Sequence, residues 1–273
     1  TVDVGNTFIR FGLFAEDSAA AKECPLATCE ITTPSSITAD EARMRLAQVM
    51  GALAADAVMP GALVPAAAVL SCVVPALERP WKAALSRTCT GRVLTVGPGL
   101  KTGMPVHYDD PAEIGPDRIA DAVAARAVYG SPCIVIDLGT TTNIEVIDAH
   151  GTFVGGVIAP GLALGARSLS AAAARLPQVE PSAPTHVIGR NTREAMRSGV
   201  VLGEVARIDG MLDMVLAEMR ATKAAGEDGV PIVITGDDAE ALAALVGHSL
   251  TVDDALTLRG LAELYRINQK PRR

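Results

Sequence analysis

Two short stretches combine a carboxylate, a glycine turn and clustered hydroxyls. They are residues 3–7 (DVGNT) and residues 137–142 (DLGTTT). The amides of a tight glycine turn can converge on an anion, and the carboxylate can hold a cation that neutralises it. One copy is weak evidence, because glycine turns commonly follow strands. Two copies about half a chain apart predict a duplicated domain, with phosphate loops facing each other across a cleft.

Apolar runs on both sides of each motif predict the strands that position these loops. Residues 134–136 and 144–147 flank the second motif, and residues 8–13 follow the first. The chain of 273 residues is rich in small apolar side chains, which suits an α/β protein with helices packed on sheets. We therefore expect two domains, 1–112 and 113–273, each carrying one loop.

A third stretch, Gly115 to Arg118, lies between the two loops and opens an alanine-rich helix. Asp117 can be read as a helix N-terminal acid, with Arg118 as its salt-bridge partner. It can equally be read as a catalytic carboxylate, and its position directly before the second loop favours that role. Thr192 precedes a long helix predicted over residues 193–219. It could cap that helix or offer its hydroxyl to a ligand.

Composition excludes several classes of function. The net charge is -7 without a basic run, and aromatic residues make up only 3%, so nucleic-acid binding is not expected. No apolar stretch is long enough to span a membrane. The five cysteines lack metal-ligand spacing, and no secretory signal is visible, which indicates reduced thiols in the cytoplasm. The sequence begins at Thr1, and we expect a few residues of the first strand to precede it.

The motifs DVGNT (3–7), GPDR (115–118), DLGT (137–140) and NT (191–192) follow one another in an order that resembles the type III pantothenate kinase family. The resemblance covers essentially the whole chain. It implies two duplicated RNase H-like domains with a central cleft, as in the superfamily of actin, Hsp70, acetate kinase and sugar kinases. It also implies a homodimer that transfers the γ-phosphoryl of ATP to pantothenate, the first step of coenzyme A biosynthesis, with Mg²⁺ and a monovalent cation, K⁺ or NH₄⁺.

The resemblance assigns roles residue by residue. Asp117 matches the general base, Asp137 the ligand of the monovalent cation, and Asp3 a residue that orients Mg²⁺ through water. The implied ATP-binding residues are Asp3, Val4, Gly5, Asn6, Thr7, Phe8, Ile9, Arg10 and Thr140. The implied pantothenate-binding residues are Tyr108, Gly115, Pro116, Asp117, Arg118 and Thr192.

Some positions depart from the family pattern. They are Pro116, Thr141, Asn143, Ile144, Glu145 and, in a late turn that lies near the nucleotide in the family, Asp237. A carboxylate in that turn would repel phosphate unless it points away or meets a cation. The alternative is therefore a non-catalytic paralogue that binds a metabolite and regulates a partner. A third reading, another small-molecule kinase or phosphatase of the superfamily, would lack the Gly-x-Asp-Arg segment.

Overall fold

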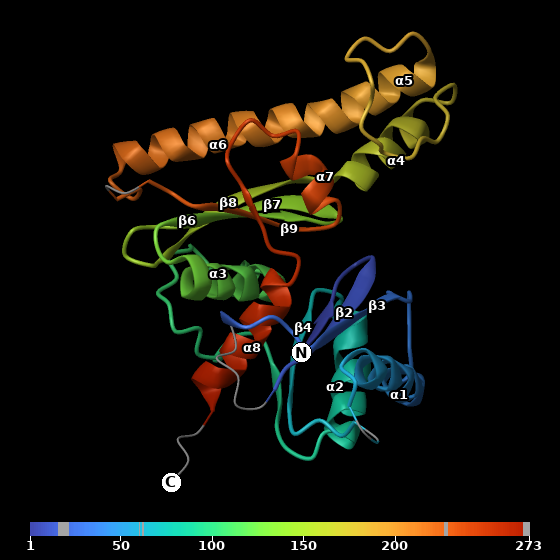
Figure 1. The fold of residues 1–273 in the computed structure, drawn as a ribbon, viewed down its shortest axis with the longest axis vertical. Helices are drawn as coiled ribbons and strands as arrows, with labels where there is room; N and C mark the ends of the chain where they lie inside the picture. The colour runs from blue at the N-terminus through green and yellow to red at the C-terminus, as the bar shows by residue number, and fades with distance from the viewer. Residues whose placement is uncertain (16–21, 60, 62, 227–228, 270–273) are drawn as a thin grey trace. The chain divides into compact units, whose positions relative to one another are not determined.

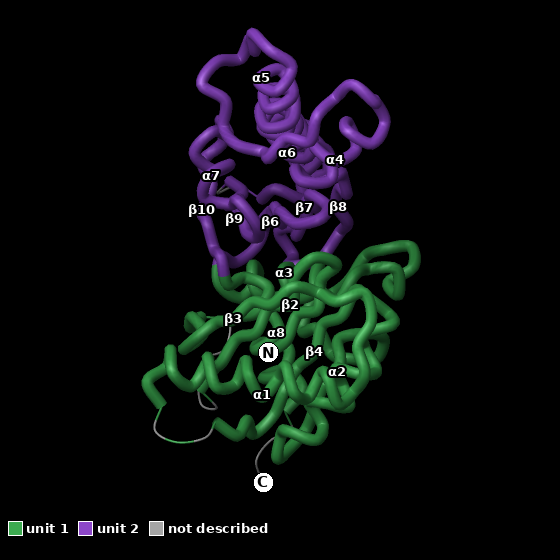
Figure 2. Tube along the Cα trace, turned by 90° about the vertical axis from the view of Figure 1, so that its right-hand side faces the viewer, with its two compact units in different colours: residues 1–128, 255–273 green, residues 129–254 purple. Residues whose placement is uncertain are grey.

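The computed structural model describes residues 1–15, 22–59, 61, 63–226 and 229–269. The chain forms two compact units, coloured separately in Figure 2. Unit 1 contains residues 1–128 together with the C-terminal segment that begins at Ala255, and unit 2 contains Tyr129–Asp254.

Unit 1 is built on a mixed five-stranded sheet with the order β3-β2-β1-β4-β5. Its strands are β1 (Val2–Val4), β2 (Phe8–Leu13), β3 (Ala27–Thr32), β4 (Ala68–Cys72) and β5 (Val93–Thr95). The first three strands pair antiparallel, whereas β4 lies parallel to β1 and β5 parallel to β4. This arrangement places the end of β1, the turn after it and the end of β4 side by side.

The helices of unit 1 follow local sequence signals. They are α1 (Ala39–Asp56), α2 (Pro75–Thr88), the 3₁₀ turn η2 (Pro111–Glu113), α3 (Pro116–Tyr129) and α8 (Leu256–Asn268). A capping box between Thr38 and Glu41 begins α1, as its sequence pattern predicts. Trp81 of α2 is fully buried and meets Phe11 edge-on, with ring centroids 5.6 Å apart. It is therefore a core residue.

Unit 2 repeats the topology of unit 1. Its strands are β6 (Cys133–Leu138), β7 (Thr141–Ile147), β8 (Phe153–Pro160), β9 (Ile232–Gly236) and β10 (Thr251–Val252), in the order β10-β9-β6-β7-β8. Strands β6, β7 and β8 pair antiparallel, and β9 and β10 continue parallel to β6. The central strand of each sheet thus carries one of the two aspartates, Asp3 or Asp137, which confirms the predicted α/β duplication.

The helices of unit 2 are α4 (Leu162–Ala172), α5 (Thr192–Arg197), α6 (Gly203–Ala221) and α7 (Ala239–Ala243). The long helix expected over 193–219 is interrupted by a π-helical segment, η3 (Ser198–Leu202). Figure 1 shows α6 along one face of the sheet, where Val205, Ile208 and Leu212 join the apolar core.

The division between the units differs from the single boundary expected after residue 112. Helices α3 and α8 belong with the first sheet, because α8 packs on β1, β2 and β4. The two helices also approach closely: a Cβ atom at Gly260 would lie only 1.9 Å from the Ala120 carbonyl oxygen. Asp117 and Arg118, at the start of α3, therefore share a unit with Asp3.

Candidate active site

The first predicted phosphate loop is the turn between β1 and β2. The Gly5 amide donates to the Phe8 carbonyl (3.0 Å), and the Thr33 hydroxyl donates to the Gly5 carbonyl (2.8 Å). The side chains of Asn6 and Thr7 are exposed at the tip of the turn. The loop is thus fixed from β1, β2 and the end of β3, while its polar tip is accessible to a ligand.

Not every predicted ATP-binding side chain faces solvent. Val4 and Ile9 lie in the apolar core, so they could offer a nucleotide only their backbone groups. Arg10 forms an ion pair with Glu30 across the strand pair, with Nε 2.9 Å from Oε2. The half-exposed Arg10 guanidinium is therefore held on the sheet surface.

Asp3 sits on β1 beside Ser71 of the parallel strand β4. The aspartate is 7% exposed and the serine 0%. Its Oδ1 atom is buried and has no hydrogen-bond partner within the described residues. A buried acceptor without a donor is unfavourable unless a ligand completes it, so this oxygen fits the water shell of a hard cation such as Mg²⁺.

The carboxylates of Asp3 and Asp117 are close enough for their charges to interact. The pKa of Asp3 is raised from 3.8 to about 6, first by burial and then by the negative charge of Asp117. The Ser71 hydroxyl and the Arg10 charge act in the opposite direction. Two neighbouring carboxylates with raised pKa values are typical of functional sites.

Asp117 is the second residue of α3, after Pro116, and its position depends on Gly115. Its Oδ1 atom accepts a hydrogen bond from the Arg118 amide at 2.8 Å. A Cβ atom at Gly115 would lie 2.4 Å from that oxygen, so a larger residue there would displace the carboxylate. Burial raises the pKa of Asp117, whereas the Arg118 and Asp117 amides and the Arg118 charge lower it. An upward shift of the pKa suits a proton acceptor.

The other predicted substrate residues of unit 1 differ in exposure. Arg118 is buried beside Asp117. Tyr108 is half-buried and lies in the irregular segment before η2.

The second predicted phosphate loop joins β6 to β7. The Gly139 amide donates to the Thr141 carbonyl (3.0 Å), and the Gly161 amide donates to the Thr140 carbonyl (3.1 Å). The Thr141 hydroxyl donates to the Asn143 side-chain oxygen at 3.2 Å. Thr141 and Asn143, two of the departures from the family pattern, thus bond to each other.

The late turn after β9 packs directly on the end of β6. Gly236 has a φ of +90°, and a Cβ atom there would lie 2.1 Å from the Leu138 carbonyl oxygen and 2.8 Å from Asp137 Oδ1. Only glycine fits both the backbone conformation and the space. The amide of Asp237 donates to the Leu138 carbonyl at 2.6 Å. The departure at position 237 therefore leaves the backbone of this turn anchored beside Asp137.

Asn191, rather than Thr192, caps α5. The Asn191 side chain accepts a hydrogen bond from the Glu194 amide at 3.0 Å, and Glu194 in turn accepts from the Arg190 amide at 2.9 Å. The exposed Thr192 side chain is not needed for the cap, so its hydroxyl can serve a ligand.

Sequence reasoning missed a hydroxyl beside each of the two aspartates. Ser71 pairs in register with Asp3, and Thr235 pairs in register with Asp137, each on the parallel neighbour of the central strand. Both hydroxyl residues are buried. The sequence signal is a hydroxyl near the end of a later apolar strand in each half, Ser71 in β4 and Thr235 in β9. Only the order of strands in each sheet shows that this hydroxyl lies beside the aspartate.

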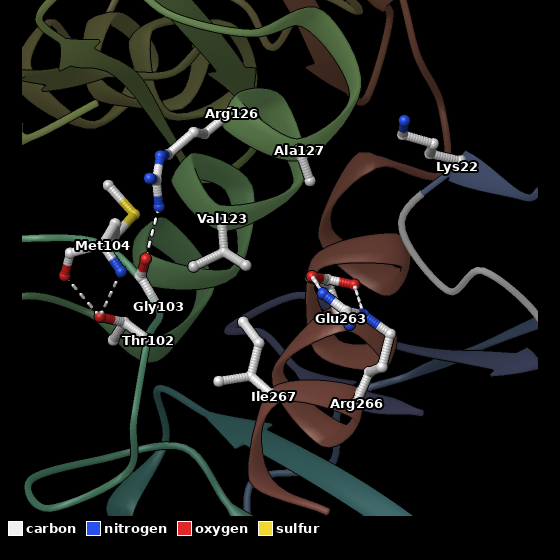
Figure 3. A pocket seen from close by; sticks show the side chains of 10 residues that line it. All are labelled: Lys22, Thr102, Gly103, Met104, Val123, Arg126, Ala127, Glu263, Arg266 and Ile267. Atoms are coloured by element: carbon white, nitrogen blue, oxygen red, sulfur yellow. Dashed lines mark hydrogen bonds and ion pairs between the residues drawn. The ribbon is translucent and has the colours of Figure 1, made fainter. Parts of the chain in front are cut away.

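A cavity of about 670 Å³ in unit 1 lies apart from these residues (Figure 3). Its walls come mainly from α3, α8 and the segment around Gly103, and none of the predicted site residues lines it. Its cationic side chains include Arg126, which donates to the Gly103 carbonyl, and Arg266, which pairs with Glu263. Both guanidinium groups are thus paired within the protein.

The described part of the chain contains no group of three or more His, Cys, Asp or Glu side chains placed to hold a metal ion. None of its helices is long and apolar enough to cross a membrane.

Solved structures resemble this fold. A conserved Campylobacter jejuni protein assigned to the Baf family of transcriptional activators superposes with a TM-score of 0.54. The match covers 98% of this chain and 97% of that one at 18% identity, so it supports the fold alone.

Curated relatives resemble the chain in sequence. A type III pantothenate kinase from Nocardia farcinica is 39% identical over 282 residues, covering 100% of this chain and 98% of that protein. A type III pantothenate kinase from Koribacter versatilis is 42% identical over 201 residues, covering 74% and 71%. The sequence model of the type III pantothenate kinase family matches residues 1–214. These matches show that the chain belongs to the type III pantothenate kinase family.

Proposed function

We propose that the protein transfers the γ-phosphoryl group of ATP to the primary hydroxyl of pantothenate. The pantothenate oxygen forms a bond to the γ-phosphorus while the bond to the β,γ-bridging oxygen breaks. The products are ADP, 4'-phosphopantothenate and a proton. The observation that carries this proposal is the buried Asp117, fixed at the start of α3 beside Asp3, in a chain of this kinase family.

Asp117 acts as the general base in this proposal. Its carboxylate accepts the hydroxyl proton, and its orientation is fixed by the hydrogen bond from the Arg118 amide to Oδ1. The Arg118 side chain complements the charge of the substrate or of the transferring phosphoryl group. Gly115 and Pro116 shape the substrate loop, and Tyr108 and Thr192 contribute further contacts to pantothenate.

The first loop, residues 3–10, and Thr140 of the second loop contact the ATP phosphates. Asp3 holds Mg²⁺ through water, as the unsatisfied Oδ1 atom supports. When bound, the ion neutralises charge on the phosphate oxygens. Asp137 would hold the monovalent cation. Its Oδ1 atom and the Leu138 carbonyl oxygen both lie at the turn around Gly236, and oxygen atoms are the ligands that suit such a cation.

A coupled assay of ADP release with ATP, Mg²⁺ and pantothenate tests this function. We expect turnover that depends on pantothenate and rises when K⁺ is added to a sodium buffer. Asp137→Asn should weaken the K⁺ stimulation more than it weakens turnover without K⁺, because it removes charge from the cation site only. Turnover that is indifferent to K⁺ and NH₄⁺ would contradict the assignment of Asp137.

Absence of turnover would favour the alternative function. If folded protein binds pantothenate by calorimetry but releases no ADP under any cation, the chain is a non-catalytic paralogue that regulates a partner. The changes to examine would then be Asn143, Glu145 and Asp237.

We also propose that the protein is a cytoplasmic homodimer. Apolar side chains are exposed on unit 2, including Ile158 on β8, Leu169 on α4 and Met214 on α6. Burying such side chains against a second copy would be favourable. Light scattering at micromolar protein should give the mass of a dimer, and a uniform monomer there would contradict this assembly.

A further inference from the structure

A buried polar contact joins the second phosphate loop to α6. The Thr142 hydroxyl donates to Glu204 Oε1 at 2.6 Å. Thr142 is 3% exposed and Glu204 is 4% exposed. Glu204 also forms an ion pair with Arg207, one turn further along α6. The Arg207 guanidinium in turn donates to the Pro160 carbonyl at 2.6 Å.

The contacts run from Thr142 through Glu204 and Arg207 to Pro160, and both Thr142 and Pro160 adjoin the second phosphate loop. Thr142 follows the loop on β7 and lies in register with Leu138 on β6. Pro160 precedes Gly161, whose amide donates to the Thr140 carbonyl at 3.1 Å. A Cβ atom at Gly161 would lie 2.2 Å from the Gly139 carbonyl oxygen, so this turn lies tightly against the loop. Glu204 and Arg207 therefore hold the loop from two sides.

Helix α6, which carries Glu204 and Arg207, is packed into the core of unit 2. Val205, Ile208 and Leu212 anchor it in the apolar core of unit 2. Glu204 precedes these anchors on α6, and its carboxylate accepts the hydrogen bond from Thr142. In the Glu204–Arg207 ion pair the acid is buried and the base is partly exposed, and such a pair contributes little net stability. Core packing alone therefore does not explain an acid and a base at these positions.

We propose that Glu204 and Arg207 are positioning residues that hold the second phosphate loop in its nucleotide-binding shape. Glu204 fixes Thr142, and Arg207 fixes the Pro160–Gly161 turn that supports Thr140. The proposal deepens the function above and rests on it, because the loop is assigned there to ATP phosphates. It assigns neither residue a contact with substrate.

The test compares Glu204→Gln and Thr142→Val with a matched control, Glu218→Gln. Glu218 is an exposed acid on the same helix, so its variant makes the same change of charge away from the loop. For Glu204→Gln and Thr142→Val we expect the KM for ATP to rise about tenfold, as for loss of a hydrogen bond to a charged group. The KM for pantothenate should stay within about twofold of the wild-type value, because the substrate residues are untouched.

The double variant Glu204→Gln/Arg207→Gln separates loss of the loop contacts from misfolding caused by an unpaired buried charge. Changing Arg207 alone would leave a buried carboxylate unpaired, whereas the double variant removes both charges together. It should fold, lose the Pro160 contact and show the same rise in the KM for ATP. Equal rises in both KM values, or values matching Glu218→Gln, would overturn the positioning role.

Hydrogen exchange of the nucleotide-free protein separates this proposal from the kinase function. In Glu204→Gln the amides of residues 139–142 and Gly161 should exchange at least about tenfold faster than in Glu218→Gln. If the wild type proves inactive but this loop loosens, the kinase function fails and the positioning role stands. If the wild type is active and the loop exchanges unchanged, the positioning role fails and the kinase function stands.

Discussion

Asp117→Asn is expected to lower the kcat for pantothenate phosphorylation by about 10²- to 10⁴-fold, the usual contribution of a general base. Asparagine keeps the side-chain oxygen that accepts from the Arg118 amide, so the start of α3 should stay in place. What is lost is the ability to accept the hydroxyl proton. The KM values for ATP and pantothenate should change much less than kcat, because the phosphate loops are intact. Steady-state rates with each substrate varied in turn measure this split.

Asp109→Asn is the matched control for this prediction. Asp109 is an exposed acid in the segment before α3 and has no assigned role, so its variant should keep the wild-type rate. Circular dichroism should show both variants folded. A near-native rate in Asp117→Asn would mean that another group, or water, accepts the proton, and that Asp117 serves α3 as an N-terminal acid.

The fold could largely be predicted from the sequence, because its signals are local. Apolar runs beside residues 3–7 and 137–142 gave the central strands, and the capping box at Thr38 gave the start of α1. Repetition of the motif predicted the duplication. The strand orders confirm it, because β8-β7-β6-β9-β10 of unit 2 corresponds strand by strand to β3-β2-β1-β4-β5 of unit 1. The predicted cleft between the halves, which depends on how the two units meet, stays a prediction.

The parts that escaped prediction depend on contacts between distant segments. Glu204 meets Thr142 across 62 positions of sequence, and no local pattern pairs them. Likewise, α3 and α8 join unit 1 because Gly260 allows close approach to Ala120, which a boundary drawn from motif spacing cannot reveal. The apolar pattern after Thr192 predicts one continuous helix, whereas the π-helical segment η3 interrupts it.

Asp3→Asn should stabilise the protein and impair catalysis at the same time. Burial raises the pKa of Asp3 from 3.8 to about 6, which means that the folded protein disfavours the ionised carboxylate. The folded state then binds a proton more tightly than the unfolded state between about pH 4 and pH 6. The free energy of unfolding of the wild type therefore falls as the pH rises through this window, and the loss is complete above about pH 6.

Asparagine has no charge to desolvate, so the free energy of unfolding of Asp3→Asn should not fall in this way as the pH rises. A shift of this size corresponds to about 3 kcal/mol, and we expect Asp3→Asn to be more stable than the wild type by up to about that amount at pH 8. At pH 4 the two proteins should differ far less. Urea denaturation at both values measures the difference. A gain of equal size at pH 4 and pH 8 would show that desolvation of the carboxylate is not its cause.

The same substitution should lower Mg²⁺-dependent turnover by about 10- to 100-fold, as for loss of a residue that orients a metal through water. Asn can still accept a hydrogen bond but cannot balance the charge of the cation, so raising the Mg²⁺ concentration should restore part of the rate. The buried, unsatisfied oxygen of Asp3 would then be unfavourable for folding and required for phosphoryl transfer. A variant that gained stability and kept full turnover at low Mg²⁺ would remove Asp3 from the metal site and leave its burial without a catalytic reason.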